Sequence, residues 1–259
     1  MCLILLSYKM HPDYRLILAA NRDEFYNRPT APLNYWADYP DVLGGQDLKG
    51  NGTWLGVTRA GRIAAITNFR DPAGHKQNAP SRGILTRNYL IRNSSPRNYL
   101  KEIGKSANTY NGFNLIVGDA SELFYCSNRA APVQKLKSGL YGISNHLLDT
   151  SWPKVKEGKI RLQDLLNEKK KIDPDKILEI LSDRSLPPDD ELPDTGVGLD
   201  WERILSPLFI TSPDYGTRSS SVVLIDKSGR VSFWERTFLN TGEEIKEGEI
   251  RKYSFTIGD

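Results

Sequence analysis

The sequence predicts an α+β fold built on antiparallel sheets. Several pairs of short apolar runs flank turn residues, which is the pattern of β-hairpins. Segments with apolar residues at helical spacing lie between these pairs. The regular alternation of single strands and helices that produces a parallel sheet is not evident. Two packed antiparallel sheets flanked by helices would accommodate these elements.

The first two hairpins carry the clearest signals. The apolar runs 2–8 and 15–20 flank the turn His11-Pro12-Asp13, so they should pair as antiparallel strands. The runs 54–58 and 62–67 flank a glycine-containing turn in the same way. Further strands are expected in the pairs 113–117 with 123–126, 133–136 with 140–144, and 219–226 with 230–237, and 250–257 should be an edge strand.

Four helices are expected between the hairpins, at 81–92, 96–103, 152–168 and 174–181. Ser81 is the expected N-cap of the first helix and Asp173 that of the last, while Pro96 should begin the second. The acidic stretch 185–198, rich in Pro and Gly, predicts a loop or lid. Turns are expected at the glycines 44, 45, 50 and 52.

The composition is that of a soluble globular protein, because hydrophobic residues make up 39% and charged residues 26% of the 259 residues. A net charge of +3 is too small to indicate a nucleic-acid-binding protein. Two cysteines and three histidines exclude a disulfide framework and a four-cysteine zinc site, and no metal centre is expected. No apolar run reaches the ~20 residues of a transmembrane helix. Since no export signal is evident, a cytoplasmic location is expected.

Cys2 is the most informative candidate for catalysis. A Met that precedes a small residue is normally trimmed, and trimming would leave a cysteine with both a thiol and a free α-amine. The α-amine has an ordinary pKa of about 8, so it can act as a base beside its own nucleophile. The alternative is that Cys2 is a small apolar residue at the start of a strand, since cysteine is often buried.

Charged residues end the second expected strand, in the run Asn21-Arg22-Asp23-Glu24. The first hairpin should bring residue 21 or 22 back near residue 2. Arg22 would then lie beside the Cys2 thiol, where a guanidinium would favour the thiolate. Asp23 would hold and orient the α-ammonium. The alternative is a solvated charged turn, which is the usual role of four polar residues in a row.

Three further polar residues lie at the ends of expected strands. Asn68 and Asn145 each follow an apolar strand, where an amide can stabilise an oxyanion. The commoner role of such an Asn is in a turn. Arg218 enters the last hairpin and is suited to binding a carboxylate, the alternative being a surface arginine.

Two long stretches resemble the NRDE family, also called the transport-and-Golgi-organisation protein 2 family. Their sequences are LILAANRDEFYNRPT and GGQDLKGNGTWLGVTRAGRIAAITNFRDP. That family in turn resembles the cysteine-type N-terminal nucleophile hydrolases, which include conjugated bile acid hydrolases and penicillin V acylases. The resemblance implies one domain over residues 1–259 with a four-layer αββα fold. It also implies hydrolysis of a non-peptide C–N amide bond, for which no cofactor is required.

The resemblance assigns a role to each candidate residue. Cys2 would be the nucleophile and carry the base, Arg22 and Asp23 would shape and hold it, Asn68 and Asn145 would be oxyanion donors, and Arg218 would be a cation that organises the site. In the hydrolases the Arg and Asp are separated by two residues, whereas here they are adjacent. Adjacent side chains of a strand point to opposite faces, so both can face Cys2 only if the chain bends.

The family resemblance also implies an alternative function without catalysis. The same pocket would bind haem, a lipid or an acyl-CoA for trafficking, with a small-molecule ligand instead of a substrate. His75 and His146 are the candidate ligands for haem iron, although a lone loop histidine is usually solvated, and Cys2 could ligate as a thiolate.

Overall fold

The structure is a computed structural model that describes residues 2–168, 170–242 and 244–258. Within these residues the chain forms two antiparallel sheets. The first sheet has six strands in the order β10 (Gly139–Ile143), β1 (Cys2–Tyr8), β2 (Tyr14–Phe25), β11 (Tyr215–Asp226), β12 (Arg230–Asn240) and β13 (Ile245–Thr256). The expected edge strand near the end of the chain is therefore confirmed, and it is longer than predicted.

The second sheet has seven strands among the described residues. Their order follows the sequence: β3 (Thr30–Tyr35), β4 (Val42–Asp47), β5 (Leu55–Thr58), β6 (Ile63–Asn68), β7 (Phe113–Gly118), β8 (Leu123–Ser127) and β9 (Ala130–Lys135). Each strand is antiparallel to its neighbour, as the hairpin signals predicted.

The helices of the described residues are α1 (Gly83–Ile91), α2 (Pro96–Gly104), α3 (Pro153–Asn167), α4 (Pro174–Leu181) and α5 (Leu199–Leu205), with single 3₁₀ turns at Ala107–Thr109 and Asp189–Glu191. Asp173 caps α4 as predicted, since its carboxylate accepts a hydrogen bond from the Asp175 backbone N–H at 3.0 Å. In this part of the chain, no helix combines the length and the apolar character that crossing a membrane requires.

The two faces of the six-stranded sheet pack against different layers. Along β1 and β2, Leu5 and Ile17 belong to the apolar cluster that includes residues of α3 and α4. Their neighbours Leu6 and Leu18 belong to the core that joins the two sheets and continues to α1 and α2. Because side chains alternate along a strand, one hairpin serves both cores.

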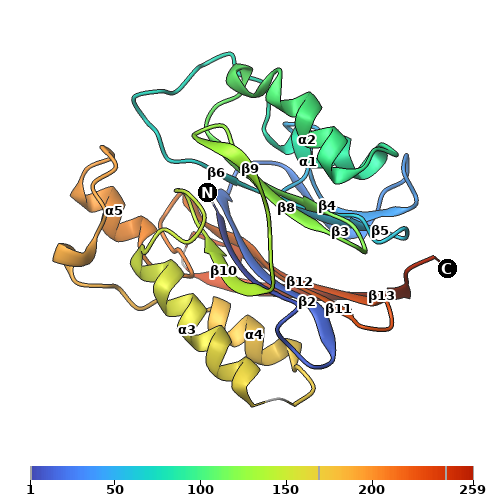
Figure 1. The fold of residues 1–259 in the computed structure, drawn as a ribbon. Coiled ribbons are helices and arrows are strands. Elements are labelled where there is room, and N and C mark those ends of the chain that lie inside the picture. Colours follow the sequence, from blue (N-terminus) through green and yellow to red (C-terminus); the bar gives the residue numbers. More distant parts are fainter. Residues whose placement is uncertain (1, 169, 243, 259) are drawn as a thin grey trace.

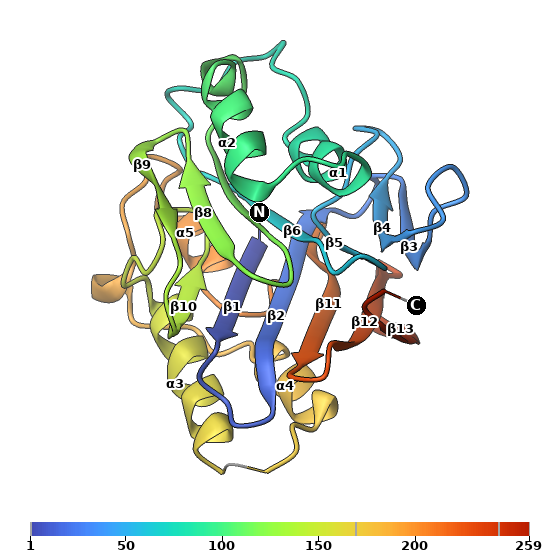
Figure 2. The same ribbon diagram turned by 45° about the vertical axis from the view of Figure 1, so that its right-hand side comes forward.

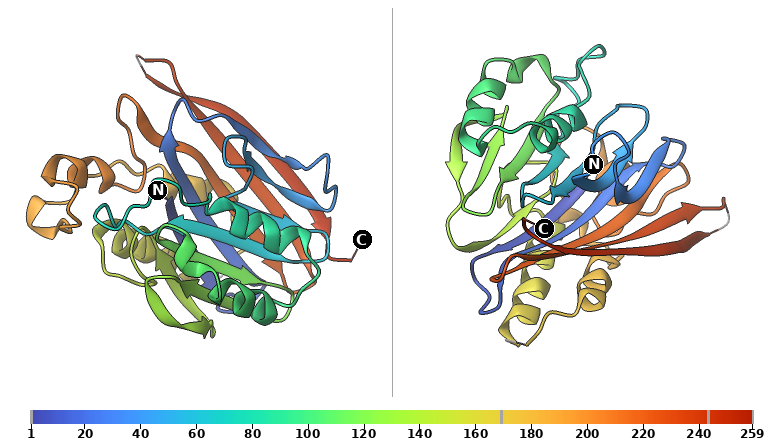
Figure 3. Two further views of the ribbon diagram at one scale, coloured as in Figure 1. Left: turned by 90° about the horizontal axis from the view of Figure 1, so that it is seen from above. Right: turned by 90° about the vertical axis from the view of Figure 1, so that its right-hand side faces the viewer.

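The layers run from α3 and α4 through the two sheets to α1 and α2 (Figures 1 and 2). The right-hand view of Figure 3 shows the sheets between the two groups of helices. The prediction of a four-layer αββα fold is confirmed by this arrangement.

One predicted hairpin is wrong. The strands expected at 133–136 and 140–144 do not pair, because β9 pairs with β8 and β10 pairs with β1 in the other sheet. A tight turn after Ser127 returns the chain against β8, and residues 136–138 then cross between the sheets. The crossing places the end of β10 beside the start of β1, where Ile143 pairs with Ile4.

Three local features also differ from the predictions. The N-cap of α1 is Arg82 and has no side-chain capping hydrogen bond, so Ser81 is not the cap. The strand β3 and the helix α5 lie in segments for which no strand or helix was predicted. Gly44 and Gly45 lie within β4 and not in a turn.

Gly45 is explained by its contact with an indole ring. A Cβ atom at this position would lie 2.3 Å from Cη2 and 2.4 Å from Cζ2 of Trp54. These distances are shorter than any van der Waals contact, so only glycine lets the ring lie on the strand. The glycine thereby fixes the position of Trp54, which lines the cavity described below.

Replacing Gly45 with alanine is expected to destabilise the protein by about 1–3 kcal/mol, because the ring must move out of a packed core. The measurement is the free energy of unfolding from urea titration. Gly104→Ala is the matched control, since a Cβ atom there meets nothing within 4 Å and the residue lies in the last turn of α2. The control should keep or slightly raise the stability. Equal effects of the two changes would contradict this explanation of Gly45.

Candidate active site

Cys2 lies at the start of β1, where the register of the first hairpin pairs it with Arg22 of β2. The prediction that the hairpin brings Arg22 beside Cys2 is therefore confirmed. Cys2 is partly exposed and lines a cavity of about 430 Å³. Other walls come from the end of β2, the end of β6 and the loop 69–82 that joins β6 to α1.

The side chains of Arg22 and Asp23 leave β2 on opposite faces of the sheet. The Arg22 guanidinium lies 4.3 Å from the centre of the Trp54 ring, on the side of the second sheet. Asp23 lies on the face that packs against α3 and α4, and its carboxylate accepts a hydrogen bond from the Thr217 hydroxyl at 2.8 Å. A register shift in β11 after Thr217 distorts the pairing here, and both Arg22 and Asp23 border the cavity.

The electrostatic surroundings act on Cys2 in both directions. Burial raises the pKa of the Cys2 thiol and the Asp23 carboxylate raises it further, whereas the Arg22 guanidinium and a hydrogen bond from the Asp23 backbone lower it. The net effect raises the pKa of the thiol above its ordinary value. The resting group is therefore a neutral thiol at pH 7, and a base is needed to form the thiolate.

Asn68 and Asn145 have different positions relative to the cavity. Asn68 ends β6 and lines it together with Cys2. Asn145 is fully buried, and its Nδ2 donates to the backbone carbonyl oxygen of Asn68 at 2.9 Å. The backbone carbonyl oxygen of Asn145 accepts a hydrogen bond from the Arg70 backbone N–H at 2.7 Å. Asn145 is not among the described residues that line the cavity. Its hydrogen bonds instead hold the backbone of Asn68 in position.

The structure does not bring Arg218 into the cavity of Cys2. Its NH1 group donates to the backbone oxygen atoms of Phe25 and Arg28, at 2.9 and 3.1 Å. Arg218 lines a separate cavity of about 170 Å³, and Arg22 and Trp54 line both cavities. Arg218 therefore holds the backbone where β2 ends.

Two basic residues near Cys2 were not predicted from the sequence. Arg82, at the start of α1, lines the cavity and donates from NH1 to the Gly112 carbonyl oxygen at 3.0 Å. Burial lowers the pKa of Arg82, against the raising effects of Glu24 and Cys2. Lys154, the second residue of α3, is only 3% exposed. Both lie at helix starts, and a sequence pattern does not show what a helix start faces.

The wall of the cavity carries more basic than acidic side chains. The basic residues are Arg22, Arg28, Lys49, Lys76 and Arg82, and the acidic ones are Asp23, Glu24 and Asp47. Arg28 and Asp47 bind each other at two points, with N–O distances of 3.0 and 2.7 Å. The remaining cations give the cavity a positive potential, which attracts anionic groups.

A family model described as Transport and Golgi organisation 2 matches residues 1–240. The chain belongs to this family. The bovine Transport and Golgi organization protein 2 homolog is 36% identical over 282 residues, and the human homolog is 34% identical over 277 residues. Each alignment covers 99% of this chain and 99% of the relative. The family resemblance inferred from the motifs is thus confirmed.

Two solved structures are similar at a greater distance. A variant of conjugated bile acid hydrolase from Clostridium perfringens aligns with a TM-score of 0.49 and 12% identity, covering 99% of this chain and 98% of that one. An N-acylethanolamine-hydrolyzing acid amidase ortholog from Caenorhabditis elegans aligns with a TM-score of 0.46 and 12% identity, covering 86% of this chain and 92% of that one.

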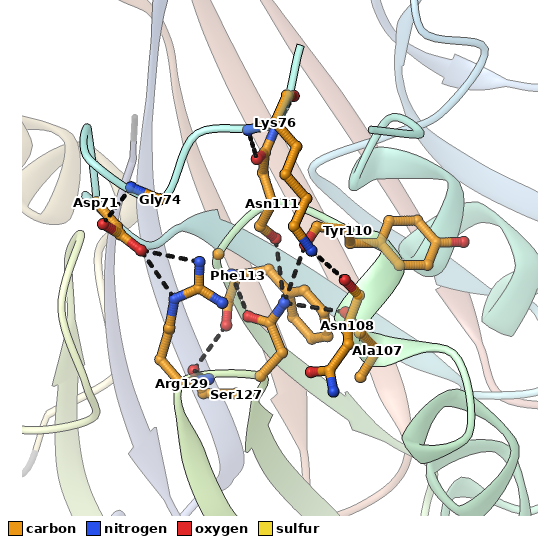
Figure 4. A network of polar contacts seen from close by, with 12 residues as sticks. Asp71, Gly74, Lys76, Ala107, Asn108, Tyr110, Asn111, Phe113, Ser127 and Arg129 are labelled. Atoms are coloured by element: carbon orange, nitrogen blue, oxygen red, sulfur yellow. Dashed lines mark hydrogen bonds and ion pairs between the residues drawn. The ribbon is translucent and has the colours of Figure 1, made fainter. Parts of the chain in front are cut away.

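In this family member the loop 69–82 is fastened to the second sheet by the polar contacts in Figure 4. The Asp71 carboxylate binds the Arg129 guanidinium, with Oδ2 at 3.1 Å from Nε and 2.9 Å from NH2. Asp71 also accepts from the Gly74 N–H at 2.9 Å. Further along, the backbone of Lys76 exchanges two hydrogen bonds with the side chain of Asn111, at 2.7 and 3.0 Å. These contacts hold one wall of the cavity in place.

The two candidate haem ligands differ in their freedom to bind iron. His75 is exposed, lies on the loop 69–82 and lines the cavity. His146 has its Nδ1 atom 2.9 Å from the Thr150 hydroxyl and its ring packed near Phe69 and Trp152. Of the two, His75 is therefore better placed to meet a ligand in the cavity.

Iodoacetamide is expected to label Cys2 about tenfold faster than Cys126 near neutral pH, because Cys2 is partly exposed whereas Cys126 is buried. Cys126 is 8% exposed, and burial raises its pKa to about 12. Intact mass and peptide mapping after brief labelling give the two rates. Labelling of both thiols should accelerate as the pH rises, since the thiolate reacts, and denatured protein is the control in which they label alike. Faster labelling of Cys126 would show that Cys2 is not reached through the cavity.

Proposed function

We propose that this protein hydrolyses a non-peptide C–N amide bond with Cys2 as its N-terminal nucleophile. The observation that carries the proposal is the position of Cys2, at the first residue of β1, on the wall of a cavity that Arg22 and Asn68 also line. A thiol, a guanidinium and an amide then face one space of about 430 Å³.

The mechanism begins with removal of Met1, which gives Cys2 a free α-amine. This amine takes the proton of the thiol, and the resulting thiolate sulfur forms a bond to the amide carbonyl carbon. The C–N bond then breaks, and the α-ammonium gives its proton to the leaving amine. Water attacks the thioester, releases the carboxylic acid and restores the thiol.

The developing oxyanion requires donors that are in place before the reaction. Asn68 provides an amide on the cavity wall, and Asn145 fixes its backbone by the 2.9 Å hydrogen bond described above. Arg22 is held against Trp54 and supports the negative charge on the sulfur. Asp23 lines the same cavity as Cys2, and its carboxylate would hold the α-ammonium.

A second candidate function is binding of haem or an acyl group in the same cavity without turnover. The observation in its favour is the excess of basic side chains on the cavity wall, which suits the anionic groups of such ligands. Titration with haem followed by the Soret band, and direct binding of an acyl-CoA, test this candidate. A Soret shift lost in His75→Ala would support haem binding, and the absence of both interactions would remove the candidate.

Cys2→Ala is expected to lower kcat on the best substrate of an amide panel by about 10³-fold or more, because no other group forms the acyl intermediate. Asn68→Ala should lower kcat by about 10²–10³-fold through loss of an oxyanion donor. Turnover is followed by release of the amine. Cys126→Ala is the matched control and should keep full activity, since its thiol lies in the core. Full turnover by both Cys2→Ala and Cys2→Ser would overturn the mechanism.

A further inference from the structure

The segment 184–201 contains most of the stretch predicted as a loop or lid, and none of its residues is buried. Apart from a 3₁₀ turn at Asp189–Glu191 and the start of α5, it forms no helix or strand. Figures 1 and 3 show α5 and the chain before it (orange) at the edge of the molecule, away from both helix layers. A segment with few buried apolar contacts opens easily, so its position depends on polar contacts.

Glu202 is the first buried residue after this segment, and 4% of its side chain is exposed. Its Oε1 atom accepts a hydrogen bond from the Thr195 backbone N–H at 2.9 Å and another from the Thr195 hydroxyl. Its Oε2 atom pairs with NH1 of Arg70, whose side chain is 5% exposed. The Arg70 guanidinium also packs on the Trp152 ring, with its carbon 4.8 Å from the ring centre. One carboxylate therefore joins the segment to Arg70.

Arg70 reaches the cavity wall through its backbone. It lies two residues after Asn68, and its backbone N–H donates to the Asn145 carbonyl oxygen at 2.7 Å. The side-chain amide of Asn145 donates to the Asn68 carbonyl oxygen at 2.9 Å. The residue before Asn145 is Ser144, whose hydroxyl donates to the Cys2 carbonyl oxygen at 3.3 Å. These bonds connect the backbone of Asn68 with that of Cys2, and Arg70 is part of the connection.

The burial of the pair between Arg70 and Glu202 makes each partner depend on the other. Removing one partner of a buried ion pair leaves an uncompensated charge out of water, which is strongly unfavourable. By contrast, the next residue of α5, Arg203, pairs with Asp189 at the surface, where their side chains are 46% and 52% exposed. Exposed pairs of this kind contribute little. Loss of Glu202 should therefore displace Arg70, and loss of Arg203 should not.

We propose that Glu202 is a positioning residue for Asn68, and that its buried ion pair with Arg70 couples the order of the segment 184–201 to the position of the Asn68 amide on the cavity wall. This inference rests on the proposed function, in which that amide donates to the oxyanion. Glu202 and Arg70 are not among the described residues that line the cavity of Cys2, so they act through Asn145 and the backbone of Asn68.

Hydrogen exchange of single backbone amides, followed by NMR in the full-length protein, tests the coupling in both directions. Arg70→Met should speed exchange at the Thr195 amide about tenfold, and Glu202→Gln should speed exchange at the Arg70 amide about tenfold, because coupling is reciprocal. Glutamine keeps the shape of Glu202 and an oxygen that can accept from Thr195, so the effect at Arg70 reports loss of the ion pair. Arg203→Met is the matched control and should leave both amides unchanged.

Low concentrations of urea separate this effect from a general loss of stability. Urea accelerates exchange that occurs through global unfolding, because global unfolding exposes much surface, whereas a local opening exposes little. Both increases should therefore be insensitive to urea.

Kinetics on the best amide substrate test the action on Asn68. Glu202→Gln should lower kcat about tenfold and change KM by less than about twofold, because an oxyanion donor acts in the transition state. In the Asn68→Ala background the same change should lower kcat by less than about twofold, since the group that it positions is already absent. Arg203→Met should keep the original kcat.

An Arg70 amide that exchanges at its original rate in folded Glu202→Gln would overturn the proposal. Equal effects of Glu202→Gln on kcat with and without Asn68→Ala would overturn it as well. Far-UV circular dichroism establishes that each variant is folded. If a single variant does not fold, the double variant Arg70→Met with Glu202→Gln decides, because it leaves no uncompensated buried charge. The amides of residues 70 and 195 should then both lose protection, and retained protection at residue 70 would contradict the coupling.

Hydrogen exchange needs no substrate. If no amide is hydrolysed, which the comparison with Cys2→Ala establishes separately, exchange at residue 70 alone decides whether Glu202 positions the cavity wall. A failure of this inference is thus distinguishable from a failure of the proposed function.

Discussion

The antiparallel register of β1 with β2 is the constraint on which the site depends. A short turn after Tyr8 returns the chain so that Cys2 pairs with Arg22 and Ile4 with Ala20. Because side chains alternate along both strands, the same register places Arg22 between the sheets and Asp23 against the helices. A shift of one residue would exchange these faces and bury the apolar residues of the hairpin on the wrong sides. The apolar cores on the two faces thus fix the positions of the charged residues.

The second requirement is that the two sheets meet at the site with their polar groups satisfied. The Thr67 hydroxyl donates to the Ser144 carbonyl oxygen at 2.7 Å, and the Asn145 amide donates to the Asn68 carbonyl oxygen at 2.9 Å. These bonds tie the end of β6 to the segment after β10, across the boundary between the sheets. A buried backbone oxygen without a partner would be costly, so the contacts fix the relative position of Cys2 and Asn68.

Charged side chains near Cys2 each lie against a group that compensates their charge. Arg70 is paired with Glu202, Arg28 with Asp47, and Arg22 lies on the Trp54 ring. Such arrangements contribute little net stability, because desolvation offsets most of the attraction. They matter more for reactivity. Charges that are held in fixed positions set the pKa of a nearby reactive group and do not reorganise during a reaction.

The sequence by itself determined the elements that depend on local chemistry. Apolar runs and their turn residues determined the first hairpin, the pairing of β5 with β6, and the final hairpin, because a two-residue period and a nearby turn are sufficient for such structures. The family motifs and the approach of Arg22 to Cys2 followed from the same signals. Tertiary structure alone decided which sheet each strand joins, as β9 and β10 show, because pairing partners are chosen by long-range packing. It also decided that Gly45 accommodates an indole ring, that Asn145 lies behind Asn68, and that Lys154 is buried at the start of α3. These outcomes depend on which distant surfaces meet, and no local pattern of residues encodes that.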